Sequence, residues 1–230
     1  MRMVWFFKHH EPSLLEASKH EQAEAVEHLI AQETLHSGYY LLVLLATLII
    51  TPGLLINNVS VIIGGMILAP LMVPILSLAL SLISGNLHGV LRSLKILALS
   101  AVISLATAAA ITLVMARAYH VVSWIPEEIT PGIYIFIAFC SGIAGAFAWV
   151  KENLASSIAG VAIAVSLMPP LCAAGIGMAL LQPLLVKNSL IILGANVVGI
   201  CVAAILVFWV LGFLGAGDVE EKAIHRNSKE

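Results

Sequence analysis

The sequence predicts an all-α, polytopic membrane protein with six transmembrane helices, and three observations lead to this fold class. About 60% of the 230 residues are hydrophobic and only 10% are charged, whereas soluble domains carry about 45–50% apolar and about 25% charged residues. The charged residues gather near both ends and in short connections between long charge-free runs. These runs are long enough to span, since a bilayer core of about 30 Å takes about 20 helical residues.

The charge-free runs predict helices at about 38–55, 57–83, 93–116, 132–150, 154–181 and 189–214. Helices are required because the runs are continuously apolar, and a backbone in lipid must satisfy its own hydrogen bonds. The predicted organisation is a cytoplasmic N-terminal region (1–36), a first membrane repeat (37–116), an extracytoplasmic connection (117–131), a second membrane repeat (132–216) and a cytoplasmic tail (217–230).

Residues 12–35 predict an amphipathic helix ahead of the first span. Ser13 and Glu16 have the spacing of a capping box at its start. Its partial apolar stripe consists of Leu15, Val26, Leu29 and Ile30. A helix with one apolar and one charged face is predicted to lie along the membrane surface or on a partner subunit.

Lysine and arginine predict the orientation of the chain. With six spans and a cytoplasmic N-terminus, nine of these residues fall inside, and only Arg117 and Lys187 fall outside. This asymmetry follows the positive-inside rule. We therefore expect a multi-pass protein of the inner (plasma) membrane with both termini in the cytoplasm.

The sequence repeats itself at an offset of 96 residues. Eight of the 18 positions in 57–74 are identical to those in 153–170, among them Asn57 with Asn153, and Pro74 with Pro170. Each copy holds three spans, so the second copy enters the membrane from the opposite side. The pattern is typical of the inverted-topology repeats of secondary transporters; the alternative is a coincidence between two proline-containing helices.

Prolines predict breaks in the second and fifth spans. Ala69-Pro70-Leu71-Met72-Val73-Pro74 lies in the second span and Ser166-Leu167-Met168-Pro169-Pro170 in the fifth. Proline within a helix removes a donor and costs about 3 kcal/mol, but it suits the first turn of a new helix. Two broken helices would direct the positive ends of their second halves toward the middle of the membrane. The alternative is a pair of simple kinks.

Polar residues, glycines and prolines near the two predicted breaks form the predicted substrate site. They are Asn57, Asn58, Ser60, Gly64, Gly65, Pro70, Pro74, Asn153, Ser156, Ser157, Gly160, Ser166, Pro169, Pro170 and Asn196. Helix N-termini, amides and hydroxyls suit a small anion or a neutral polar solute, although free carbonyls could take a cation. A structural role as hydrogen bonds between helices is the alternative. No aspartate or glutamate falls within a predicted span, which argues against carboxylate-driven antiport.

Other function classes find little support. The net charge of −2 provides no basic patch for nucleic acid, and the chain carries none of the common catalytic or cofactor motifs. No enzyme, cofactor or metal is therefore predicted. His20, Glu24, Glu27 and His28 have spacings that can bind metal, but they fit a solvated helix face. The three cysteines are interpreted as packing residues.

Three short motifs resemble a known family. Residues 52–58 (PGLLINN), 61–66 (VIIGGM) and 70–74 (PLMVP) are similar to the domain-of-unknown-function family numbered 389, which comprises uncharacterised prokaryotic hydrophobic membrane proteins. The resemblance extends over about 38–214. Many members look longer at the N-terminus, with a soluble domain before the helices, whereas about 36 residues precede them here.

The sequence thus favours a transporter or channel for a small polar or anionic solute, with a midplane site at the two helix breaks. The alternative is a non-transporting membrane scaffold or sensor that acts through its N-terminal helix. A homo-oligomer is also predicted, because small residues permit close contacts between helices. These are Ser100, Ser104, Gly142, Gly145 and Ala146.

Overall fold

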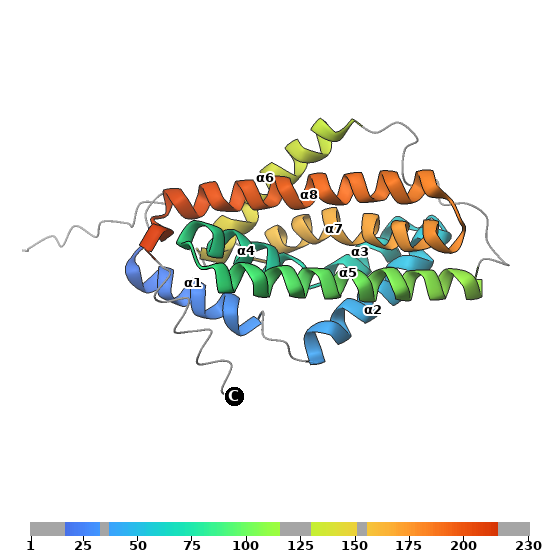
Figure 1. Ribbon diagram of the computed structural model, residues 1–230, viewed down its shortest axis with the longest axis horizontal. Coiled ribbons are helices and arrows are strands. Elements are labelled where there is room, and N and C mark those ends of the chain that lie inside the picture. The colour runs from blue at the N-terminus through green and yellow to red at the C-terminus, as the bar shows by residue number, and fades with distance from the viewer. Residues whose placement is uncertain (1–16, 33–36, 116–129, 151–155, 216–230) are drawn as a thin grey trace, which may run out of the picture.

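The computed structural model describes residues 17–32, 37–115, 130–150 and 156–215, which form one helical bundle (Figure 1). The described residues contain helices and no strand. The helices are α1 (Lys19–Gln32), α2 (Ser37–Leu55), α3 (Val59–Leu68), α4 (Met72–Ser84), α5 (Leu87–Met115), α6 (Pro131–Val150), α7 (Ser156–Ala179), α8 (Pro183–Val210) and the short 3-10 helix η1 (Phe213–Gly215).

The bundle is built from apolar helices of membrane-spanning type. Four of them, α2, α5, α6 and α8, are long and apolar enough to cross a bilayer, and α3 with α4 forms a fifth candidate span. Helix α7 has 24 residues, and its segment Leu167–Ala179 is apolar but shorter than the four candidate spans. The all-α membrane class is thus confirmed, while a total of six spans stays a prediction.

Short polar turns reverse the chain at both ends of the broken span. Asn57, with φ of 54°, closes the α2–α3 turn in the left-handed region, which asparagine tolerates, and Asn58 caps α3 by accepting from the Val61 amide at 3.2 Å. Gly85, with φ of 75°, ends α4. Asn86 Oδ1 then accepts from the amides of His88 and Gly89, both at 3.1 Å. Consecutive spans therefore run antiparallel (Figure 1).

The second predicted span is broken, as expected. Helix α3 stops at Leu68, α4 starts at Met72, and the two axes differ by 51°. Ala69 takes an extended conformation with ψ of 118°, because the ring of Pro70 disfavours helical geometry in the residue before it. The break therefore lies where the sequence placed it.

The predicted break in the fifth span is wrong. Helix α7 continues through Pro169 and Pro170 from Ser156 to Ala179. Both prolines are buried, and α7 packs against α2, α3, α5, α6 and α8. A proline ring is compatible with helical φ, and dense packing on several sides holds α7 helical despite the two missing amide donors.

Two buried clusters form the core. The first centres on α2, α3, α5 and α7, and the second on α1, α4, α6 and α8. The small residues predicted to drive self-association lie inside this core: Ser100, Ser104, Gly142, Gly145 and Ala146 are all buried. A Cβ added to Gly142 would lie 2.8 Å from the Cα of Ile200. These residues join helices of one chain, which removes the stated basis for the predicted homo-oligomer.

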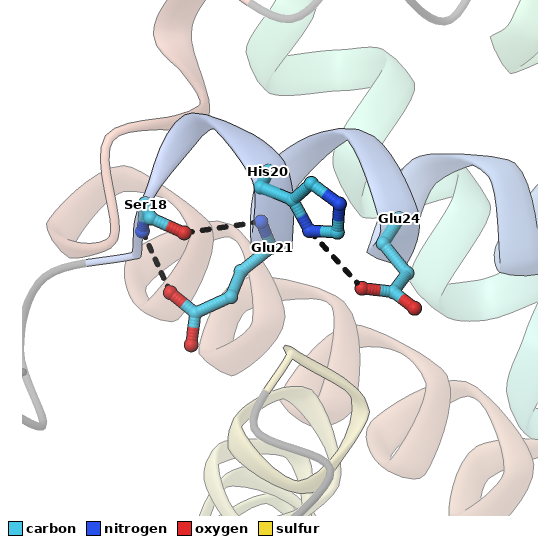
Figure 2. A network of polar contacts seen from close by, with 4 residues as sticks. All are labelled: Ser18, His20, Glu21 and Glu24. Atoms are coloured by element: carbon cyan, nitrogen blue, oxygen red, sulfur yellow. Dashed lines mark hydrogen bonds and ion pairs between the residues drawn. The ribbon is translucent and has the colours of Figure 1, made fainter.

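Helix α1 is shorter than predicted and packs on its own bundle. It begins at Lys19 rather than residue 12, and Ser18 with Glu21 forms the capping box (Figure 2). The Ser18 amide donates to Glu21 Oε2 at 2.7 Å, and the Glu21 amide donates to Ser18 Oγ at 3.2 Å. The predicted cap of Ser13 and Glu16 lies outside the described residues. The apolar face of α1 contacts α4 and α6 of its own chain, and a position along the membrane surface or on a partner subunit stays a prediction.

Candidate functional site

The break between α3 and α4 exposes backbone polar groups inside the bundle. Pro70 and Pro74 have no amide hydrogen, so the carbonyls of Met66 and Pro70 lose their usual helical donors. The Ala69 amide donates to the Met66 carbonyl at 3.2 Å and replaces one of them. On the other side of the break, no side chain caps the first turn of α4. Carbonyl oxygens and the positive end of a helix therefore lie close together along the chain.

The proline pair of α7 leaves a second set of carbonyls without helical donors. Pro169 and Pro170 cannot donate to the carbonyls of residues 165 and 166, one turn earlier in the helix. The pair lies in a completely buried stretch that runs from Leu167 to Gly177. An unbroken helix has no free N-terminus at this point, so only α4 can direct a helix dipole at the site.

The two proline-bearing segments belong to one buried cluster. Ala69 and Leu71 of the break belong to the same buried cluster as Leu167, Met168 and Leu171 of α7. Helices α3 and α7 also pack directly against each other. The tertiary structure therefore places both segments in the same cluster of mostly apolar side chains.

A small polar cluster lies beside this region, at the contact of α2, α5 and α7. The Thr47 hydroxyl donates to the Val43 carbonyl at 2.8 Å and also lies 3.2 Å from Ser104 Oγ of α5. The Cys172 thiol of α7 lies beside the hydroxyls of Thr47 and Thr51. All four side chains are completely buried.

The sequence interpretation missed most of this cluster. Thr47 and Thr51 are four residues apart and share one face of an apolar helix, which is a detectable signal. Cys172 was read as a packing residue, and its full burial agrees with that reading. Its proximity to the two threonines depends on how α7 docks on α2, which no local pattern specifies.

Three other buried hydroxyls donate to carbonyls of their own helices. Ser100 donates to the Ile96 carbonyl at 2.7 Å and Thr112 to the Ala108 carbonyl at 2.7 Å. Ser189 donates to the Leu185 carbonyl at 2.6 Å. Ser100 also lies 3.2 Å from the Tyr39 hydroxyl of α2. Of these contacts, the one between Ser100 and Tyr39 fits the structural alternative, in which polar side chains link membrane helices.

The predicted site residues are spread along the bundle. Asn57, Asn58, Ser60 and Gly64 are exposed at or near the α2–α3 turn, whereas Gly65 packs so closely on Ile50 of α2 that a Cβ there would clash. Pro70 is half-buried, and Pro74, Pro169, Pro170 and Asn196 are buried. Of these described site residues, Pro70 and Pro74 lie at the α3–α4 break, and Pro169 and Pro170 form the pair in α7. A substrate-binding role for any of these residues stays a prediction.

The remaining predicted site residues are described in part or not at all. Asn153 lies outside the described residues. Ser156, Ser157, Gly160 and Ser166 lie within α7 as helical backbone.

Charged and metal-binding groups lie away from this region. His20 Nδ1 lies 3.4 Å from Glu24 on α1 (Figure 2), and the His20 side chain is 89% exposed. Within the part of the chain that the structure describes, no three histidine, cysteine or acidic side chains come together as a metal site would require. The described arginine and lysine residues of the spans lie near the N-terminal ends of their helices: Arg92 and Lys95 within the first three turns of α5, and Lys187 in the second turn of α8.

Comparison with known proteins supports the motif resemblance. The family model "Domain of unknown function (DUF389)" matches residues 66–202. An uncharacterised protein of Methanocaldococcus jannaschii is 30% identical over 208 residues, which cover 84% of this chain and 62% of that protein. The chain thus spans less than two thirds of the length of this relative. No solved structure matches.

Proposed function

This chain belongs to the domain-of-unknown-function family 389, and on that premise we propose that it is a membrane transporter or channel for a small polar or anionic solute. The observation that carries the proposal is the broken span α3–α4, whose break shares a buried cluster with the proline-bearing segment of α7. Helix breaks cost free energy in lipid. Transporters use such breaks to direct backbone groups at their substrates near the midplane.

The chemistry of the break favours a solute that accepts hydrogen bonds. The uncapped first turn of α4 offers amide donors and a positive dipole end. The carbonyls freed by Pro74, Pro169 and Pro170 suit the donor groups of a neutral polar solute. A carboxylate that could bind a coupling cation is missing from the described parts of the spans. We therefore expect small anions or small polar molecules to cross.

An inverted repeat of three spans each is part of the proposal, and the buried faces of α5 and α8 support it. At the offset of 96 residues, Ser93 corresponds to Ser189, Ile96 to Ile192 and Ser100 to Asn196, and all six residues are buried. The same offset relates Ala46, Ile50 and Leu54 of α2 to Gly142, Ala146 and Val150 of α6, which are buried as well. Equal burial at equal repeat positions is what two copies of one unit would show.

The proposed orientation has both termini on the cytoplasmic side of the inner membrane. Lys19 is the first residue of α1, and the start of α5, which contains Arg92 and Lys95, lies at the end of the bundle where α1 packs. The start of α8, which contains Lys187, lies at the opposite end (Figure 1). This distribution among the described residues follows the positive-inside rule.

Flux through reconstituted protein tests the proposal. Proteoliposomes would be assayed with a panel of small anions (chloride, nitrate, formate, acetate) and neutral solutes (urea, glycerol, glycine). Replacing Pro70 and Pro74 by alanine restores two amide donors and straightens the span, so flux should fall by about tenfold or more. The matched control is Pro183→Ala, at the exposed first turn of α8, which should leave flux unchanged. Folded protein that passes none of these solutes would refute the proposal.

A further inference from the structure

Helix α1 covers one end of the bundle and contacts only one half of the broken span (Figure 1). Its buried apolar face consists of Ala25, Val26, Leu29 and Ile30. This face joins a cluster with side chains of α4, α6, α8 and η1. Helix α1 therefore bridges α4 to the two helices of the second proposed repeat.

Two side-chain hydrogen bonds set the position of α1. Gln22 Nε2 donates to the Leu211 carbonyl at 3.0 Å. This carbonyl has no helical donor because α8 ends at Val210 and Gly212 turns the chain with φ of 85°. Trp149 Nε1 of α6 donates to the Ala25 carbonyl at 3.3 Å. Specific polar contacts thus tie α1 to α6 and to the end of α8.

Helix α4 is jointed at its start and held by α1 along its length. Its only covalent link to α3 passes through Ala69, Pro70 and Leu71, where the axis bends by 51°. Val73, Leu76 and Leu80 of α4 lie in the same buried cluster as the apolar face of α1. A few residues that absorb a change of backbone angle are the usual form of a hinge. Movement of α4 about this joint would break its contacts with α1, in addition to those that it makes with α5 and α8.

Ser77 is a second, independent observation on α4. Its side chain is 3% exposed, and its hydroxyl has no hydrogen-bond partner among the described residues. A buried hydroxyl without a partner destabilises the arrangement that buries it. Displacement of α4 would expose this group to water or to a passing solute, so the packed arrangement is not the best one for α4 itself.

We propose that α1 is a latch that holds α4 against α8, and that its release lets α4 swing about the Ala69–Leu71 joint and open this end of the bundle. The link between opening and solute passage rests on the proposed function. The mechanical link between α1 and α4 does not, and it can be measured without any substrate.

Amide hydrogen exchange of the full-length protein in lipid nanodiscs tests the latch. Val26→Asp places a charge in the buried face and should release α1, and Gln22→Ala is a milder variant that removes only the bond to Leu211. The control is Glu24→Gln on the exposed face. With the latch, Val26→Asp raises exchange in α1 and also in α4 by about tenfold, Gln22→Ala raises both less, and α5 and α8 keep their protection.

Faster exchange in α1 with unchanged exchange in α4, in either variant, would overturn the proposal and leave α1 as a passive cover. If the Val26→Asp protein loses protection in all its helices, that variant is unfolded, and the exchange of α4 in Gln22→Ala decides between the two outcomes. Faster solute flux in the released variants would support the role of the latch in transport. Released α4 with no flux of any solute would count against the transport function and leave the latch standing.

Discussion

The hydroxyls of Thr47 on α2 and Ser104 on α5 lie 3.2 Å apart and are completely buried. This pair is a direct side-chain hydrogen bond between two spans of the first proposed repeat. It lies beside Cys172 of α7. The contact shows how three helices far apart in the sequence share one small polar cluster within an apolar core.

The Thr47–Ser104 bond should contribute a modest, measurable coupling. Thr47→Val keeps the shape of the side chain and removes its hydroxyl, and Ser104→Ala removes the hydroxyl of the partner. In a double-mutant cycle we expect a coupling free energy of about 0.6 kcal/mol, the average for such bonds in membrane helices. Unfolding in mixed detergent would measure it. Thr112→Val, which loses only a bond to its own helix, should show no coupling to Ser104→Ala, and equal coupling there would contradict the assignment.

Gly142 should tolerate no side chain. A Cβ at this position would lie 2.8 Å from both the Cα of Ile200 and the Cβ of Ala203, so Gly142→Ala must separate α6 from α8. Overpacking of this kind costs about 1–3 kcal/mol, and unfolding midpoints in detergent would show it.

The matched control for Gly142 is Gly194→Ala on α8, where nothing lies within 4 Å of the added atom. This substitution should be neutral or stabilise the helix by up to about 1 kcal/mol. Equal destabilisation by the two substitutions would show that close packing of α6 on α8 is not the reason why Gly142→Ala destabilises the protein.

The proline pair of α7 should reduce stability in the wild-type protein. Because α7 is already helical, Pro169→Ala adds an amide donor for the carbonyl of residue 165 without changing the fold. The free energy of unfolding should rise, by at most about 3 kcal/mol, and solute flux should fall if that carbonyl serves the path. Pro183→Ala at the start of α8 should change neither. A less stable Pro169→Ala protein would mean that packing of the buried ring outweighs the missing donor.

The capping box of α1 should control how firmly the latch is formed. Ser18→Ala removes the acceptor for the Glu21 amide, at a cost of about 1 kcal/mol to the helix. Hydrogen exchange should accelerate in the first turn of α1 and stay constant in α5. Replacing Lys19, which is exposed and not part of the cap, by alanine should have little effect. If the Lys19 variant frays the helix as much as the Ser18 variant, the cap is not what stabilises it.

Local patterns predicted some features and missed others for identifiable reasons. The break after Leu68 was predictable because Pro70 restricts Ala69 directly. The same rule failed at Pro169 and Pro170, because α7 is packed on several sides and this packing overrides the local cost. Asn57 and Asn58 were grouped with the prolines as site residues, yet they lie at the α2–α3 turn, a position that follows from turn geometry.

Composition and the spacing of charges determined by themselves that this chain is a bundle of apolar helices, because lipid leaves a backbone few other solutions. The positions of most helices and the break at Pro70 follow from the same local physics. Only the tertiary structure decided that the small residues of α5 and α6 serve contacts within the chain, that α7 stays helical, and that α1 folds onto α4, α6 and α8. These outcomes depend on which helix faces pack against each other. The free energies of contacts between distant segments cannot be predicted from a local sequence pattern.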